Sequence, residues 1–223
     1  MNGFEERDAT AQDALIADAD QRQNNVGQDG AERAQAVGNI EKRRNYMLGI
    51  ATSGMFIALM IISAFIKIPI GTIPITLQLM VANVCCLLLG KKWGTISVAL
   101  YIVLGLLGLP IFAGGGGFAY FLQPSFGFII GFAVGGFFAA LFREKLGKTS
   151  FSAYMSASLL NILIIDIVGL VYGAVIMYGY NHSAMTAWKF LMTFLIPFIP
   201  FDIAKGAIGS IVCVKVNKFC KLY

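Results

Sequence analysis

The sequence predicts an all-α integral membrane protein with six transmembrane helices. Hydrophobic residues make up 57% of the 223 residues and charged residues only 13%, which is far too apolar for an ordinary soluble domain. The apolar residues gather in runs long enough to cross a hydrocarbon layer about 30 Å thick. Basic residues fall in short clusters between these runs, as bilayer topology requires. The pattern therefore argues against a soluble enzyme and against a nucleic-acid partner.

The first 41 residues form a separate segment with the opposite charge. Nine of the twelve acidic residues lie there, with only three of the seventeen basic residues. The segment has no basic start followed by an apolar core, so it is not a secretory signal. We expect residues 1–41 to be an acidic, disordered cytoplasmic tail and residues 42–223 to be the transmembrane domain.

Six runs are expected to cross the bilayer. A basic cluster at 42–44 precedes the first run, a Gly-Lys-Lys sequence at 90–92 ends the second, and Pro110 closes the third. A glycine-rich stretch leads to the fourth, a basic turn separates the fourth from the fifth, and Pro197 and Pro200 introduce the sixth. The expected spans are residues 46–66, 74–89, 94–109, 126–142, 152–178 and 201–216.

One further apolar run, residues 184–196, is too short to cross. It predicts a short interfacial helix between the fifth and sixth spans, with a seventh crossing as the alternative. Six crossings place eleven basic residues on one side and only Lys67 and Lys189 on the other. An odd number would disturb this division, so we expect both termini in the cytoplasm.

Two acidic residues, Asp166 and Asp202, lie within apolar runs, where an isolated charge is costly. Lys205 shares a helix face with Asp202 at i, i+3. The pair is expected in the first turns of the last helix, where free backbone N–H groups favour an anion, and it could hold a ligand. A purely structural ion pair is the alternative. Asp166 could relay protons, contact a ligand or bond a neighbouring helix.

A glycine-rich loop follows the third span, and irregular backbone survives at membrane depth only when it is buried in protein or lines a cavity. No Gly-Lys-Ser/Thr follows it, so it is not a phosphate loop. Phe112 and Tyr120 could supply apolar walls to a pocket for a small ligand. An ordinary external loop is the alternative. The loop contains four consecutive glycines: Gly114, Gly115, Gly116 and Gly117.

Other polar and small residues give weaker signals. Gln78 could face the pocket or bond a neighbouring helix. Ala51, Gly54 and Ala58 form a small-residue pattern in the first span, which could serve internal packing or a partner surface. The sequence has no Ser/His/Asp set, metal cluster or nucleotide motif, so we expect no enzyme activity, no metal and no cofactor.

Several motifs, in order and spacing, resemble the BioY family, the biotin-binding S components of energy-coupling factor transporters. The resemblance covers residues 45–215. Two motifs depart from the family pattern: Gly54 stands where alanine is common, and Pro-Ser-Phe-Gly replaces Pro-Thr-Gly-Gly at 124–127. Asp166 has no counterpart. The motifs are Ile-Pro-Ile-Thr-Leu-Gln at 73–78, Leu-Leu-Leu-Gly at 87–90, residues 104–114, residues 124–132, and Pro-Phe-Ile-Pro-Phe-Asp-Ile-Ala-Lys at 197–205.

The resemblance implies a multi-pass protein of the bacterial cell membrane that binds biotin from outside and delivers it inward. It implies a biotin site at Asp202, Lys205 and the loop of residues 112–117. It also implies that Gly54 and Ala58 dock a transmembrane coupling subunit, which works with two ATP-binding-cassette ATPases.

We expect the biotin rings to lie against Phe112 and Tyr120. The polar ends of biotin are expected to reach four side chains: Asp202, Lys205, Gln78 and Asn161. Three alternatives remain open: a stand-alone biotin carrier without ATPase partners, an S component for another vitamin, and a structural or regulatory subunit that binds no small molecule.

Overall fold

The computed structural model describes residues 2–68, 75–180 and 186–219, with side chains in the N-terminal helix described at residue 33 and from residue 35 onward. The chain divides into two units, residues 1–48 and 49–223. The first is the N-terminal part of helix α1 (Asn2–Phe65), where Glu41 and Arg44 form an exposed ion pair at 3.8 Å. The side chains of residues 1–32 lie outside the described part, so the disordered tail stays a prediction.

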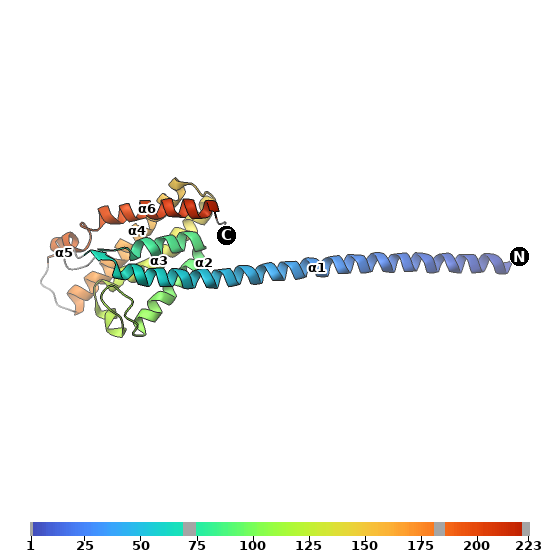
Figure 1. Cartoon of the computed structure of the whole chain (residues 1–223), viewed down its shortest axis with the longest axis horizontal. Coiled ribbons are helices and arrows are strands. Elements are labelled where there is room, and N and C mark those ends of the chain that lie inside the picture. Colours follow the sequence, from blue (N-terminus) through green and yellow to red (C-terminus); the bar gives the residue numbers. More distant parts are fainter. Residues whose placement is uncertain (1, 69–74, 181–185, 220–223) are drawn as a thin grey trace. The chain divides into compact units, whose positions relative to one another are not determined.

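The second unit is almost entirely helical (Figure 1). Two-residue strands β1 (Lys67–Ile68) and β2 (Ile75–Thr76) pair in antiparallel orientation after α1. The remaining elements are α2 (Gln78–Leu106), the 3-10 helix η1 (Phe118–Leu122), α3 (Phe126–Leu146), α4 (Phe151–Ala174), the π-helix η2 (Val175–Tyr180), α5 (Ala187–Phe194) and α6 (Ile199–Phe219).

Five helical segments in the described part of the chain are long and apolar enough to cross a membrane. The all-helical membrane architecture is thus confirmed, with the β1–β2 pair as a small addition. The segments are Gln35–Phe65, Gln78–Leu106, Phe126–Leu146, Phe151–Tyr180 and Ala187–Phe219.

Helix α2 is a hairpin rather than one rod. Gly90 has φ 73° and ψ 178°, a conformation outside the helical region that glycine adopts readily. A Cβ added at Gly94 would lie 2.5 Å from the Cα of Cys86, and Gln78 hydrogen-bonds Tyr101 across 23 residues. In a straight helix, residues eight apart lie about 12 Å apart. The arms 78–89 and 91–106 therefore run antiparallel, as the expected second and third spans should.

Helices α3 and α4 pack through a stripe of glycines spaced four residues apart. A Cβ added at Gly131 would lie 2.9 Å from the Cα of Ile165, and side chains at Gly127 and Gly135 would meet Tyr172 and Asn161. Small residues at this spacing let two helix backbones approach closely inside lipid. The stripe was not among the small-residue patterns expected from the sequence.

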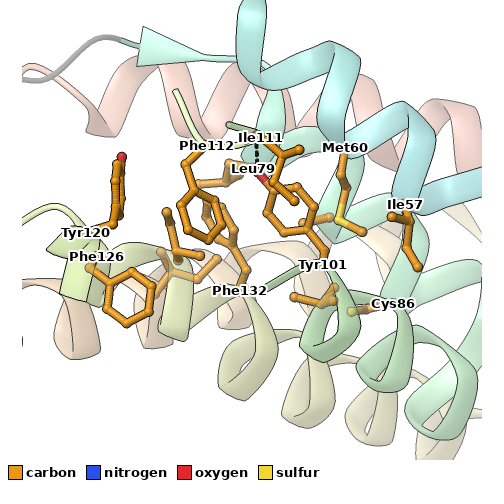
Figure 2. Close-up of a cluster of buried hydrophobic side chains, with 14 of the residues drawn as sticks. Ile57, Met60, Leu79, Cys86, Tyr101, Ile111, Phe112, Tyr120, Phe126 and Phe132 are labelled. Carbon is orange, nitrogen blue, oxygen red and sulfur yellow. Dashed lines mark hydrogen bonds between the residues drawn. The ribbon is translucent and has the colours of Figure 1, made fainter. Parts of the chain in front are cut away.

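Helix α2 also packs against α3 and α6, and α6 packs against α4. The main core lies between these helices and the end of α1 (Figure 2). There Met60 of α1 and Tyr101 of α2 are fully buried beside Phe112. The core anchors the loop of residues 107–125 to the helices that surround it.

The two ends of the bundle differ in charge. The starts of α2, α3 and α6 and the end of α1 meet at one end, which we call the site end. At the other end Glu144 of α3 accepts the backbone N–H of Lys91 at 3.0 Å and pairs with its Nζ at 3.1 Å. Most of the basic residues described in the second unit lie toward that end: Lys91, Lys92, Arg143, Lys145, Lys148, Lys215 and Lys218.

Candidate substrate-binding site

A cavity of about 260 Å³ opens at the site end of the bundle. This is close to the lower limit of pockets that hold small ligands, about 300 Å³. The walls are mostly aromatic and aliphatic, with a few polar groups. They are formed by Ile75, Thr76, Gln78, Leu79, Ala113, Gly114, Tyr120, Gln123, Ser125, Phe128, Ile129, Phe132, Ile165, Phe194, Phe198, Asp202 and Lys205.

The charged part of the wall is an ion pair on α6. Lys205 Nζ lies 2.5 Å from Asp202 Oδ1, and the two residues are only 8% and 4% exposed. Lys205 also donates to the backbone oxygen of Thr76 at 3.2 Å, which connects α6 to β2. A buried charge needs such partners, because removing it from water is otherwise strongly unfavourable. The pair is thus a desolvated polar centre in an apolar cavity.

The backbone at this point differs from the expectation of free N–H groups beside the pair. Asp202 lies in the first turn of α6, but its N–H already donates to the Phe198 oxygen at 2.8 Å. The segment before α6 continues the helical bonding, so the N–H of Asp202 is not available to a ligand anion. Lys205 is therefore the group at this point that can neutralise a ligand anion.

The glycine loop is folded rather than open. Phe112 and Gly115 exchange two backbone hydrogen bonds, of 2.8 and 3.0 Å, and Gly117 N–H donates to Gly105 O at 2.7 Å. Gly115 and Gly117 have φ of 118° and 96°, where other residues are strained. Gly114 lies on the cavity wall. Gly115, Gly116 and Gly117 do not; they form the turn that holds Gly114 there.

Of the two aromatic residues expected on the cavity wall, one lies on it and the other lies behind it. Tyr120 lies on the cavity wall, and burial raises the pKa of its phenol, so its hydroxyl stays protonated and can donate. Phe112 lies behind the wall and is 1% exposed. Its ring packs against Tyr101, Tyr120 and Phe126 with centroids 5.5, 4.7 and 6.2 Å apart (Figure 2). Phe112 therefore supports the wall from the core.

The two expected amide contacts, Gln78 and Asn161, differ from each other in where they lie. Gln78 is 3% exposed, lies on the cavity wall and donates from Nε2 to the Tyr101 hydroxyl at 2.8 Å. Asn161 does not lie on the wall. It donates to Asn83 Oδ1 at 2.8 Å, and Asn83 donates to Ser158 Oγ at 2.8 Å. Asn161 thus belongs to a hydrogen-bonded network between α2 and α4.

Several wall residues were not expected from the sequence. Phe194 and Phe198 come from α5 and the turn that follows it, and Gln123 and Ser125 lie just before the start of α3. The signal for Phe194 was the apolar run of residues 184–196, which is too short to cross the bilayer, and Phe198 lies in the motif of residues 197–205 that contains Asp202. Asp166 is half-buried on α4 next to the wall residue Ile165, but it is not itself on the wall.

The small-residue pattern of α1 lies away from the cavity. Ala51, Gly54 and Ala58 are all exposed, and a Cβ added at Gly54 would have no atom within 4 Å. Internal packing of this stripe, one of the two expected roles, therefore does not occur among the described residues.

The chain is similar to known membrane transport proteins. The BioY family model matches residues 36–221. A biotin transporter BioY of Thermotoga maritima is 33% identical over 175 residues, covering 77% of this chain and 97% of that protein. A probable biotin transporter BioY of Pyrococcus horikoshii is 34% identical over 169 residues, covering 75% and 95%. A crystal structure of the S-component for biotin from an ECF-type ABC transporter superposes with a TM-score of 0.67 at 32% identity, covering 76% of this chain and 90% of that one.

Proposed function

Because the chain belongs to the BioY family, we propose that it binds biotin in the cavity described above and serves as the S component of an energy-coupling factor transporter. It is a multi-pass membrane transport subunit rather than an enzyme. The similar proteins carry the name biotin transporter, and the similar structure is an S-component for biotin.

The observation that supports a ligand here is the buried Asp202–Lys205 pair on an otherwise apolar wall. Biotin combines an apolar fused ring system with a cyclic urea and a carboxylate. Aromatic walls suit the rings, and a few fixed polar groups suit the ends. Lys205 can donate to an anionic or carbonyl oxygen, and Asp202 can accept an N–H group.

We propose six crossings, with both termini in the cytoplasm. Support comes from the α2 hairpin, which divides one of the five long segments into two antiparallel arms, and from the basic residues at the end opposite the cavity. Positive residues favour the cytoplasmic side. The cavity then opens to the outside, and α5 lies along the outer interface before α6 crosses.

The proposed partners are a transmembrane coupling subunit and two ATP-binding-cassette ATPases, within the lipid bilayer. The exposed Ala51, Gly54 and Ala58 on α1 form a surface that another helix could approach closely. Such a complex would drive the loaded protein inward.

Isothermal titration of the detergent-purified protein tests the proposal. Biotin should bind, and biotin whose carboxylate is amidated should bind more weakly if Lys205 meets that end. A folded sample that ignores biotin but binds another vitamin would identify an S component of different specificity. Uptake into liposomes by the protein alone, under a proton gradient, would instead show a stand-alone carrier.

A further inference from the structure

A chain of hydrogen bonds connects the cavity wall to the loop behind it. Gln78 Nε2 donates to the Tyr101 hydroxyl at 2.8 Å, and that hydroxyl donates to the backbone oxygen of Ile111 at 2.7 Å. Tyr101 is fully buried, and Gln78 is 3% exposed and on the wall. Figure 2 shows the Tyr101 ring directed at Ile111, in the middle of the core.

The chemistry of this chain determines which end of the Gln78 amide faces which way. A phenol hydroxyl carries one proton, and a backbone carbonyl can only accept. The Tyr101 proton is therefore committed to Ile111, so toward Gln78 the Tyr101 oxygen must accept. Only the NH₂ group of an amide can donate, so Nε2 must face Tyr101 and Oε1 must take the other direction.

We propose that Tyr101 is a positioning residue that holds the Gln78 carbonyl oxygen toward the cavity, where this oxygen accepts an N–H group of the ligand's cyclic urea. The inference rests on the proposed function and deepens it, because it assigns the urea end of biotin to the Gln78 wall. Among the described residues Gln78 Oε1 makes no hydrogen bond of its own.

Two consequences distinguish this role from packing. Without the Tyr101 hydroxyl the amide can turn over and present its NH₂ to the urea N–H, which removes the hydrogen bond and sets two donors against each other. The hydroxyl therefore acts on the ligand only through Gln78. If the Gln78 amide is absent, removing the hydroxyl should have no further effect on affinity.

The test is a double-mutant cycle of biotin affinity, measured by titration calorimetry on the detergent-purified chain. Gln78→Met should weaken binding about 10- to 100-fold and Tyr101→Phe about 3- to 10-fold, as expected for a ligand hydrogen bond lost or disordered. In the Gln78→Met background, Tyr101→Phe should change affinity by less than about twofold. Tyr154→Phe removes the hydroxyl of an equally buried tyrosine that is not on the cavity wall, and it should leave affinity unchanged.

A second probe is the pair of cyclic carbamates in which oxygen replaces one or the other urea N–H of biotin. One of the two should bind the wild-type chain about 10- to 100-fold more weakly than biotin does, and this penalty should fall below about fivefold in Gln78→Met. This comparison remains decisive even if Tyr101→Phe fails to fold in a thermal unfolding assay.

Additive effects of the two substitutions, or a carbamate penalty unchanged in Gln78→Met, would overturn the inference while biotin binding by the wild-type chain still stands. Failure of the wild-type chain to bind biotin would overturn the proposed function and this inference together.

Discussion

The Asp202–Lys205 pair is the most strongly desolvated charged feature among the described side chains. Its side chains are 5% and 10% exposed, whereas the Lys91–Glu144 pair at the opposite end has side chains that are 49% and 32% exposed. An ion pair in water contributes little, but one inside a protein leaves a costly unpaired charge if it is broken. The two pairs should therefore respond very differently to substitution.

We expect Lys205→Ala to weaken biotin binding by about 10- to 150-fold, because it removes a charged donor from the cavity and leaves Asp202 without its partner. Titration calorimetry on detergent-purified protein measures the change. Lys91→Ala is the matched control, since it also breaks a lysine–carboxylate pair but lies at the far end of the bundle. Equal affinity for Lys205→Ala and the wild-type chain would exclude Lys205 from the site.

At this scale the sequence predicted the wall residues whose chemistry is unusual for their surroundings. Asp202, Lys205 and Gln78 stand out because polar side chains inside apolar runs have few possible roles. Thr76 does not stand out in the same way, because Lys205 contacts its backbone oxygen, and every residue has one. Phe112 and Asn161 have the expected character, but whether each side chain faces the cavity or the core depends on the course of the loop for Phe112 and on the rotation of α4 for Asn161. One sequence does not reveal either.

Among the elements, α1 carries the exposed stripe most suited to a partner. Ala51, Gly54 and Ala58 leave the helix backbone accessible, and an added side chain at Gly54 would touch nothing within the chain. A substitution there should therefore act on association rather than on folding.

We expect Gly54→Leu to leave biotin affinity unchanged and to abolish stable association with the coupling subunit and its ATPases, because a leucine side chain holds an approaching helix away. Co-purification of the complex from membranes measures association, and calorimetry measures binding. Ala99→Leu, at another small exposed position on α2, should preserve the complex. An intact complex with Gly54→Leu would remove this surface from the proposed interface.

The elements show why the two arms of α2 were predictable from the sequence and the buried glycine stripe of α3 was not. Apolar runs and Gly-Lys-Lys marked the α2 arms, because a lysine pair favours a turn at the membrane surface. In the sequence, the stripe of Gly127, Gly131 and Gly135 in α3 looks no different from the small residues of α1, yet the α3 stripe is buried against α4 and Gly54 is exposed. Burial of a small-residue stripe depends on which neighbour faces it.

For the whole molecule, the proposed six crossings depend on the α2 hairpin. A hairpin returns residue 107 to the same side of the membrane as residue 67, whereas a single straight helix would carry it to the opposite side. The interaction between Lys67 Nζ and the Ala113 oxygen, at 3.2 Å, agrees with the hairpin.

We expect single cysteines placed at Lys67 and Leu107 to react with a membrane-impermeant maleimide from outside intact cells, and one at Lys92 to react only after permeabilisation. All three positions are exposed, and the native cysteines would first be replaced by alanine. Labelling of the Lys67 and Leu107 positions from opposite sides would contradict six crossings.

The turn of the α2 hairpin has a consequence for biogenesis. Its arms, 78–89 and 91–106, are shorter than the roughly 20 residues that integrate independently as a membrane helix. Its turn is held by Glu144, which is translated about 50 residues later. We therefore expect the two arms to enter the bilayer as one unit, and the turn between them to take its final form after α3 has emerged from the ribosome and docked.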